Sequence, residues 1–256
     1  MVELPVAGLD ERYRVNPSKI IALGLNYADH VRESVTEQAA GRRSELPTEP
    51  ILFPKTPNSV IGPGETIRIP EILAAYEFEE PRTDYEGELA LIVGSRCKHV
   101  SREEAWAVIY GFTCMNDVSQ RNIQKGDRSG WFRGKSFDTF APIGPQIVPT
   151  ETVLAAGSRR EEPAEAGGGA EPALGIRTRL NGRVVQDGNT RDMIFDVPEI
   201  VSFVSRNFTL EPGDIIVTGT PSGVGPIRHG DSVEVEIDGI GTLRNPVVDE
   251  SVTDTG

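Results

Sequence analysis

Residues 85–94 read Tyr-Glu-Gly-Glu-Leu-Ala-Leu-Ile-Val-Gly, and the rest of the chain is organised around this stretch. Its apolar residues and closing glycine predict a strand, whose period of two places Glu86 and Glu88 on one face. Neighbouring carboxylates repel each other unless water or a cation screens them. Because oxygen ligands at this spacing suit Mg²⁺, Mn²⁺ or Ca²⁺ better than zinc, a divalent-ion site is one interpretation. A solvated outer face is the other, and the pair alone does not decide between them.

The composition is typical of a soluble globular protein. The chain has 256 residues, of which 38% are hydrophobic, enough for one large domain or two small ones. Its formal net charge of −13, from 39 acidic and 26 basic residues, argues against nucleic acid or an anionic membrane as the main partner. Only 5 of the basic residues are lysines, and an acidic surface poor in lysine would fit a salt-adapted cytoplasm.

Cysteine spacing and the N-terminal sequence indicate the cellular compartment in which the protein is expected. Cys97 and Cys114 form no Cys-x-x-Cys pair, so neither a disulfide framework nor a thiolate metal site is indicated. The first residues lack the basic region of a signal peptide, and nowhere do about 18 apolar residues run together. We therefore expect a cytoplasmic protein that has no membrane partner.

A second polar pair follows the first strongly apolar segment, a strand predicted over residues 19–25. Residues 26–34 read as the start of a helix, on which His30 and Glu33 are neighbours. A carboxylate in this position can orient an imidazole so that its second nitrogen acts as a base, whereas an incidental surface histidine is the alternative. Residues 34–50 are polar without a clear period and predict either a lid beside this helix or an ordinary surface loop.

Two further candidates lie in the middle of the chain. A capping-box pattern, Ser-Arg-Glu-Glu at 101–104, predicts the start of a helix. The apolar run that follows ends at Asp117, and a carboxylate at the end of a core strand is a natural third ligand for an ion. Lys135 lies among glycines and aromatic residues, where a lysine can serve as a fixed positive charge or as a donor to an anionic substrate.

The second half of the chain alternates strand and turn patterns. Residues 157–172 are of low complexity and predict an exposed, flexible insertion. Strand patterns resume at 176–180, followed by an Asn-Gly hairpin turn. The remaining expected elements are a helix over 193–206 and strands over 214–219, 232–237 and 241–244.

A glycine-rich loop, Gly-Thr-Pro-Ser-Gly-Val-Gly at 219–225, separates two of these strands. Its spacing fails the Gly-x-Ser-x-Gly pattern of a hydrolase nucleophile, so Ser222 is not expected to attack a substrate. It also matches neither the dinucleotide-binding nor the Walker pattern. Glycines at this density are typical of a tight turn or of backbone that approaches a ligand, with Thr220 as a candidate polar contact.

Taken in order, these motifs resemble those of the fumarylacetoacetate hydrolase family. They are Asn-Tyr-Ala-Asp-His30, Glu86-Gly-Glu88, Asp117, Gly-Lys135-Ser-Phe-Asp, Met-Ile-Phe-Asp, Leu-Glu-Pro-Gly-Asp-Ile-Ile and Thr-Gly-Thr220-Pro-Ser-Gly-Val-Gly. Each motif is weak alone, whereas the ordered set, which covers residues 18–247, is specific. The resemblance implies a mixed α+β, β-rich fold, a mixed β-sandwich roll with a few peripheral helices. It also implies a lead-in at 1–17, one catalytic domain over 18–256 and a homodimer.

The resemblance further implies roles for individual residues. The metal ligands, for Mg²⁺ with Mn²⁺ or Ca²⁺ as alternatives, would be Glu86, Glu88 and Asp117. His30 and Glu33 would form a water-activating dyad on a segment that orders over the substrate, assisted by the charge of Lys135. The contacts to a small-molecule 2-oxo acid would come, with Lys135, from Arg121, Gln124 and Thr220.

The resemblance favours a metal-dependent hydrolase that breaks a C–C bond in a 2,4-dioxo acid of the acylpyruvate or fumarylpyruvate type. Chelation of the carboxylate and the adjacent 2-oxo group makes the enolate a better leaving group. The same enolate can be reprotonated or decarboxylated, so an isomerase or decarboxylase of 2-hydroxy-dienedioates in aromatic catabolism is the alternative. A non-catalytic homodimer that binds a 2-oxo acid is a third possibility.

Overall fold

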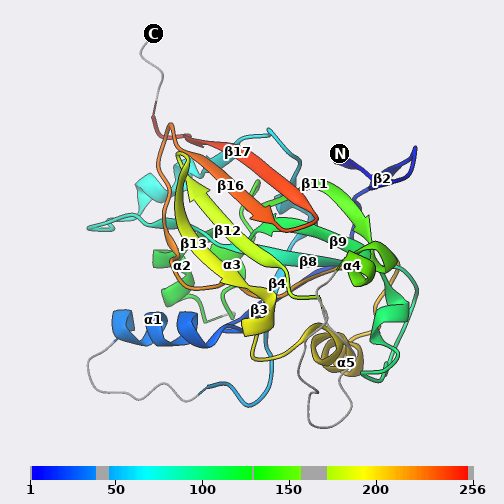
Figure 1. Ribbon diagram of the computed structural model, residues 1–256. Coiled ribbons are helices and arrows are strands. Elements are labelled where there is room, and N and C mark those ends of the chain that lie inside the picture. Colours follow the sequence, from blue (N-terminus) through cyan, green and yellow to red (C-terminus); the bar gives the residue numbers. More distant parts are fainter. Residues whose placement is uncertain (1, 39–45, 129, 157–171, 253–256) are drawn as a thin grey trace.

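Two β-sheets contain most of the strand residues in the computed structural model, which describes residues 2–38, 46–128, 130–156 and 172–252 (Figure 1). A seven-stranded sheet has the order β4-β3-β14-β8-β9-β11-β5, and a five-stranded sheet has the order β13-β12-β16-β17-β6. A three-stranded sheet, β10-β7-β15, and the pair β1-β2 complete the named strands. The predicted β-rich fold with a few peripheral helices is confirmed.

The bounds of the elements are as follows. The seven-stranded sheet contains β3 (Ile20–Gly24), β4 (Ile51–Lys55), β5 (Val60–Ile61), β8 (Gly87–Val93), β9 (Ile109–Asn116), β11 (Ala141–Pro149) and β14 (Ile215–Val217). The five-stranded sheet contains β6 (Ile67–Ile69), β12 (Gly175–Leu180), β13 (Arg183–Asn189), β16 (Ser232–Ile237) and β17 (Gly241–Asp249). The small sheets contain β1 (Glu3–Pro5), β2 (Arg12–Arg14), β7 (Thr83–Tyr85), β10 (Ser119–Gln120) and β15 (Gly225–Pro226). The helices are α1 (Ala28–Gln38), α2 (Arg121–Gly126), α3 (Phe132–Lys135), α4 (Thr150–Ala156) and α5 (Val197–Asn207), with 3₁₀ turns η1 (Pro57–Ser59), η2 (Glu71–Ala75), η3 (Ala105–Val108) and η4 (Thr190–Asp192).

β8 lies within the seven-stranded sheet and is buried along its whole length. Leu89 and Leu91 face a core to which the five-stranded sheet and α5 contribute. Ala90 and Ile92 face a second core that includes residues of β1 and β3. Burial of both faces explains the near-continuous apolar sequence of the strand. Because Glu88 lies two residues before Ala90, it shares that face and enters the interior, which excludes the solvated outer face considered for the carboxylate pair.

Most expected strands are confirmed, with ends that differ by a few residues. The hairpin between β12 and β13 turns through Asn181 and Gly182, whose φ angles of 52° and 79° suit a tight hairpin turn. The predicted helix at 193–206 begins at Val197, because the Asp196 carboxylate caps it by accepting a hydrogen bond from Glu199 N at 2.8 Å. The residues at the β12–β13 turn and at the start of α5 therefore favour locally the same conformations that the fold requires.

The helix predicted after residues 101–104 is a single 3₁₀ turn, η3. Ser101 and Glu104 do exchange the two hydrogen bonds of a capping box, with N···O distances of 3.2 and 3.3 Å. However, β9 begins at Ile109, directly after η3, and leaves no length for an α-helix. The capping-box hydrogen bonds are as predicted, but the helix is a 3₁₀ turn and not the start of a longer helix.

Some expectations fall outside the described ranges. Of the insertion predicted at 157–172, residues 157–171 are outside these ranges. Residues 39–45 of the segment predicted as a lid or surface loop are outside them too. The boundaries expected at 1–17 and 18–256 stay predictions. Among the described residues, no helix is long and apolar enough to cross a membrane.

Asp214 ties the start of β14 to the residues that lead into β3. Its buried carboxylate accepts hydrogen bonds from the Ser18 hydroxyl at 2.6 Å and from Glu211 N at 2.7 Å. It also accepts from the amides of Ser18 and Lys19, both at 3.1 Å, and forms an ion pair with the Lys19 ammonium. Burial raises the pKa of Asp214, but these donors outweigh burial and hold that pKa below its usual value.

We predict that Asp214→Asn lowers the free energy of unfolding by about 1–3 kcal/mol at neutral pH, because an amide replaces one of two acceptor oxygens by a donor. A carboxyl whose pKa is lower in the folded state stabilises the fold above its unfolded pKa, and this stability is lost as the pH falls through the folded pKa. Urea denaturation at decreasing pH should therefore show the two proteins converging in acid. Asp187→Asn, which changes an exposed carboxylate, is the matched control, and equal losses in both variants would contradict the prediction.

Candidate active site

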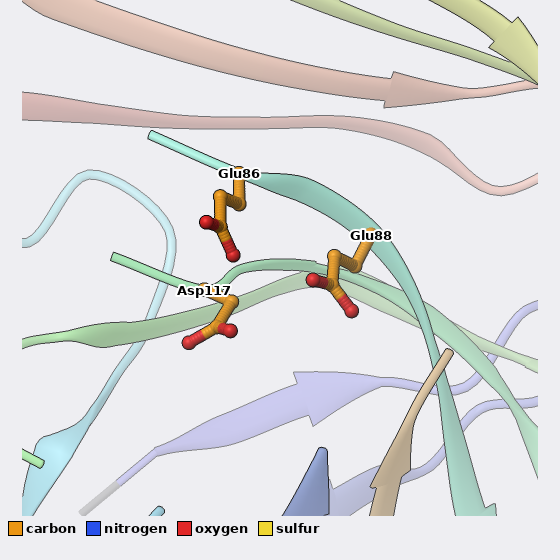
Figure 2. A group of neighbouring side chains, drawn as sticks. All are labelled: Glu86, Glu88 and Asp117. Atoms are coloured by element: carbon orange, nitrogen blue, oxygen red, sulfur yellow. The ribbon is translucent and has the colours of Figure 1, made fainter. Parts of the chain in front are cut away.

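Three carboxylates converge where β7 ends, β8 begins and β9 ends. Glu86 lies between β7 and β8, Glu88 is the second residue of β8, and Asp117 follows β9. Each offers one oxygen within 4.8 Å of the others, and none of these residues is more than 4% exposed. Figure 2 shows the three side chains grouped between the neighbouring strand ends. The cluster predicted from the sequence therefore exists as a geometric unit.

Strand pairing brings these carboxylates together. Gly87 pairs with Asn116 in the antiparallel ladder between β8 and β9. At the end of this ladder, Asp117 N donates to Glu86 O at 2.8 Å, and Asn116 Oδ1 accepts a hydrogen bond from Glu86 N at 2.9 Å. The cluster is positioned by the backbone hydrogen bonds of the fold.

The carboxylates have different electrostatic surroundings. Burial raises the pKa of Glu86, but the charges of Arg121 and Lys135 outweigh burial and lower it. Burial and the two neighbouring carboxylates raise the pKa of Glu88 well above its usual value. Within the described ranges, the one hydrogen-bond donor to the Glu88 carboxylate is Gly219 N, at 2.6 Å. Glu88 is thus a buried acid to which no basic side chain of those ranges is bonded.

Two buried lysines bond to the other two carboxylates. Lys135, from α3, donates to Glu86 at 2.7 Å and to Asp117 at 2.5 Å. Lys55, the last residue of β4, donates to the other Asp117 oxygen at 2.6 Å and to the Lys135 carbonyl at 2.5 Å. Burial lowers the pKa of Lys55 despite its bond to Asp117. For Lys135, burial is outweighed by the charges of Asp117 and Glu86, which raise its pKa.

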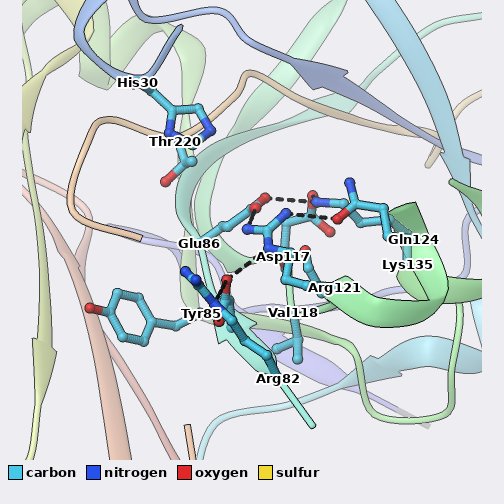
Figure 3. Close-up of polar contacts among 12 residues, drawn as sticks. His30, Arg82, Tyr85, Glu86, Asp117, Val118, Arg121, Gln124, Lys135 and Thr220 are labelled. Atoms are coloured by element: carbon cyan, nitrogen blue, oxygen red, sulfur yellow. Dashed lines mark hydrogen bonds and ion pairs between the residues drawn. The ribbon is translucent and has the colours of Figure 1, made fainter. Parts of the chain in front are cut away.

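Arg121, from α2, extends this network. Its Nε donates to Asp84 at 2.7 Å, its Nη1 donates to Gln124 Oε1 at 2.8 Å, and its Nη2 donates to Glu86. Asp84 also accepts a hydrogen bond from Arg82 Nε at 2.9 Å. Figure 3 shows these contacts as one network around Glu86. The guanidinium fork is occupied by protein groups here, so its expected substrate contact stays a prediction, as does that of Gln124.

His30 and Glu33 lie near the start of α1, as their spacing predicts. Nδ1 of His30 is 3.4 Å from a Glu33 carboxylate oxygen, and that carboxylate accepts the Gly223 N–H at 3.0 and 3.2 Å. The residues before the helix are fixed by the Asn26 side chain, which donates to two backbone carbonyls at 2.8 and 3.1 Å. His30 is among the charged groups that lower the pKa of Glu86, so its ring lies near the carboxylates, and Figure 3 draws both groups in one view. The pair is therefore formed and lies at the edge of the carboxylate network.

Thr220 lies in the glycine-rich loop between β14 and β15 and is buried. Its hydroxyl donates to Gly87 O at 2.9 Å and accepts from Gln186 Nε2 at 2.8 Å. The same loop supplies the Gly219 N–H to Glu88, with Gly219 at a φ of 93°. A Cβ at position 219 would meet a neighbouring side chain at 2.8 Å, so this close approach requires glycine. The substrate contact expected of Thr220 stays a prediction.

The structure brings every residue predicted for the site into this region, and the roles of the individual residues stay predictions. Two functional candidates, Lys55 and Asp84, were not anticipated. One available signal was Lys55 itself, a lysine directly after the short segment Ile-Leu-Phe-Pro at 51–54. The other was the alternation of Asp84, Glu86 and Glu88, which marks a third acid on the same face.

The donor set fits a hard divalent cation. All three candidate ligands are carboxylates, the chemistry preferred by Mg²⁺, Ca²⁺ and Mn²⁺, and they are held by paired strands. The raised pKa of Glu88 indicates a carboxylate that needs a nearby positive charge to ionise. A divalent ion at this point would provide that charge. Glu86, Glu88 and Asp117 are thus the residues that would hold it.

The family profile described as Fumarylacetoacetate (FAA) hydrolase C-terminal matches residues 19–248. The chain belongs to the fumarylacetoacetate hydrolase family. Oxaloacetate tautomerase YisK of Bacillus subtilis is 38% identical, over 90% of this chain and 70% of its own. The structure of 2-hydroxyhepta-2,4-diene-1,7-dioate isomerase from Mycobacterium marinum matches with 39% identity and a TM-score of 0.72, over 93% of this chain and 77% of that one. Fumarylpyruvate hydrolase from Pseudomonas aeruginosa, solved with Mn²⁺ and pyruvate, matches with 28% identity and a TM-score of 0.78, over 97% and 96%.

These similarities confirm the resemblance and the fold expected from it. The relatives are named as a tautomerase, an isomerase and a hydrolase, so membership in this enzyme family does not by itself select one reaction. One neighbour was solved with Mn²⁺, in agreement with the oxygen donors found here.

We predict that Glu88→Gln abolishes Mn²⁺ binding without destabilising the ion-free protein. The amide keeps the shape of the side chain, and unlike a change at Glu86 or Asp117 it removes no ion-pair partner of a buried lysine. Thermal unfolding should give an ion-free midpoint at or above that of the wild type, and added Mn²⁺ should no longer raise it. Glu104→Gln, at an exposed position, is the control and should respond to Mn²⁺ like the wild type. Wild-type Mn²⁺ stabilisation in Glu88→Gln would contradict the metal assignment.

Proposed function

We propose that the chain is a Mg²⁺- or Mn²⁺-dependent enzyme that hydrolyses a C–C bond in a 2,4-dioxo acid of the acylpyruvate or fumarylpyruvate type. The observation that carries this proposal is the His30–Glu33 pair at the edge of a buried three-carboxylate cluster. A base and a Lewis-acid site in one region suit the attack of water on a chelated 2-oxo acid.

The charges of the site favour an anionic substrate. Lys55, Lys135 and Arg121 bond directly to the ligand carboxylates, so these basic groups already offset much of the negative charge. A bound divalent ion adds positive charge and, when present, supplies Lewis-acid stabilisation of an enolate at the 2-oxo group. The carboxylate of a 2-oxo acid would balance that charge.

The His30–Glu33 pair would carry out the proton transfer. Glu33 holds Nδ1 of His30, which leaves Nε2 to take a proton from water as that water attacks the carbonyl remote from the carboxylate. The bond between that carbonyl carbon and the CH₂ carbon on its pyruvate side breaks. The proton then passes to the released carbon, so an acylpyruvate and water give a carboxylic acid and pyruvate. Lys135 would offset the charge that develops in the site.

Keto–enol tautomerisation of a 2-oxo diacid such as oxaloacetate is the second candidate, favoured by the 38% identity to YisK. In this reaction His30 would move a proton from the enol oxygen to the carbon next to the one that bears that oxygen, so that the C=C bond becomes C=O, and no water would attack. The isomerase or decarboxylase of 2-hydroxy-dienedioates shares the same enolate, and the isomerase is supported by the Mycobacterium marinum neighbour.

A panel of substrates separates these candidates. Acylpyruvates, fumarylpyruvate and enol-oxaloacetate are supplied with Mg²⁺, with Mn²⁺ or with EDTA, and loss of the enol absorbance and formation of pyruvate are followed. We expect pyruvate and the matching carboxylic acid in equal amounts, and only when the ion is present. Tautomerisation without cleavage of any acylpyruvate would favour the second candidate. Binding without turnover of any substrate would overturn both and favour the non-catalytic protein.

We predict that His30→Asn lowers kcat by about 10²–10⁴-fold, the usual contribution of a general base. Mn²⁺ binding should change little, because none of the hydrogen bonds of the His30 ring joins a candidate ligand within the described ranges. His99→Asn is a matched control, since His99 is exposed and has a φ of 55°, which asparagine tolerates well. Full activity in His30→Asn would remove the proposed base.

We predict that pyruvate and Mn²⁺ each strengthen the binding of the other, because each supplies charge that the other needs at this site. The coupling is reciprocal, and a factor of about 5–150 is typical of such linkage. Calorimetric titration of Mn²⁺ with and without saturating pyruvate measures this factor without any turnover. Equal Mn²⁺ affinities in the two titrations would contradict chelation of the 2-oxo acid.

Three further expectations accompany this proposal. They are Mg²⁺ as the physiological ion, a homodimer and a cytoplasmic location. Sedimentation of the purified protein tests the homodimer, and metal analysis of freshly purified protein tests the ion.

A further inference from the structure

Tyr85 takes no part in the proposed chemistry, yet it is a buried residue that directly precedes the candidate ligand Glu86. Tyr85 is the last residue of β7 and donates to the Gly223 carbonyl at 2.9 Å. Burial and the charges of Asp84 and Glu33 raise the pKa of Tyr85 to about 12, so the phenol remains a donor at neutral pH.

The backbone of Gly223 is held from three sides. Its carbonyl accepts from Tyr85, and its N–H donates to both oxygens of the Glu33 carboxylate at 3.0 and 3.2 Å. On the third side, a Cβ at position 223 would lie 2.1 Å from Val185 O of β13. Its φ of 95° also requires glycine. The N–H that faces Glu33 is therefore fixed in direction by contacts to two strands.

This link joins two halves of the site that lie on different supports. The candidate ion ligands are held by buried paired strands, whereas Glu33 lies on α1 with its side chain 34% exposed. A partly exposed carboxylate samples several rotamers unless donors hold it, and holding it costs side-chain entropy. The Gly223 N–H is a donor that can hold it, and hydrogen bonds to charged acceptors are the strong ones.

We propose that Tyr85 is a positioning residue for the His30–Glu33 pair. Tyr85 fixes Gly223, the Gly223 N–H fixes the Glu33 carboxylate, and Glu33 fixes the His30 ring. These contacts form an unbroken series from the strand that precedes Glu86 to the proposed base. The inference rests on the proposed function, in which His30 is that base.

Tyr85→Phe tests this role, because it removes the hydroxyl and keeps the ring. We expect kcat to fall by about tenfold to a hundredfold, the size of effect that a misplaced catalytic group produces. KM and Mn²⁺ affinity should not change, because the hydroxyl is bonded to neither a ligand nor a proposed substrate contact. Tyr110→Phe is the matched control, since its hydroxyl bonds to Glu11 at 3.1 Å on the surface and should leave kcat unchanged.

A readout that does not depend on turnover is the state of the His30 ring. The chain has 3 histidines, so long-range ¹H–¹⁵N spectra can resolve each ring. In the wild type we expect the tautomer protonated on Nδ1 to dominate in His30, since Nδ1 faces Glu33. In Tyr85→Phe this preference should weaken, while the spectra of His99 and His229 stay unchanged.

A double-mutant cycle with Glu33→Gln decides whether Tyr85 acts through Glu33. If it does, Tyr85→Phe causes no further loss of kcat in the Glu33→Gln background. Additive losses, or a Tyr85→Phe protein that matches Tyr110→Phe in kcat and in the His30 spectrum, would overturn the inference. The proposed function fails differently, because then the wild type lacks turnover or His30→Asn retains it. In that case the comparison of the His30 tautomer between the wild type and Tyr85→Phe still tests whether Tyr85 positions the His30 ring.

Discussion

The ion pairs between Lys135 and Glu86 and between Lys55 and Asp117 join side chains that are at most 5% exposed. Removing an ionised group from water costs several kcal/mol, which only well-placed partners offset. The fold must therefore bring β4, α3 and the ends of β8 and β9 to one place at once. A slip of one residue between β8 and β9 would turn Glu88 to the other face of the sheet, so buried charge reinforces the register that the apolar residues set.

Glu88 is the exception in this network. Glu86 and Asp117 each have lysine partners, whereas Glu88 accepts a hydrogen bond from the Gly219 backbone and has a raised pKa. Such a carboxylate reduces stability when no cation is near, and local conflicts of this kind are expected at functional sites. The glycine-rich loop joins both parts of the site, because Gly219 contacts Glu88 and Gly223 contacts Glu33. This single loop relates the carboxylate cluster to the proposed base.

The elements that the sequence predicts well are those with strong local signals. The apolar run of β8, the two-residue spacing of Glu86 and Glu88 and the helical spacing of His30 and Glu33 all persist in the structure. Lys55 could not be assigned because its partner, Asp117, is 62 positions away and is chosen by tertiary packing. The helix expected after residues 101–104 shortens to η3 because β9 follows at once, which no capping signal encodes. Convergence of the ligands was suggested by family resemblance, since spacing alone left a solvated face open.

One measurement tests most directly whether Glu86, Glu88 and Asp117 share an ion. Crystals of the protein soaked in MnCl₂ would be measured on both sides of the manganese absorption edge. A single anomalous peak should lie roughly 2.0–2.6 Å from a carboxylate oxygen of each of the three residues, the range for oxygen ligands of such ions. A peak bound elsewhere in the chain, or density between the three carboxylates with no anomalous signal, would contradict a shared divalent ion.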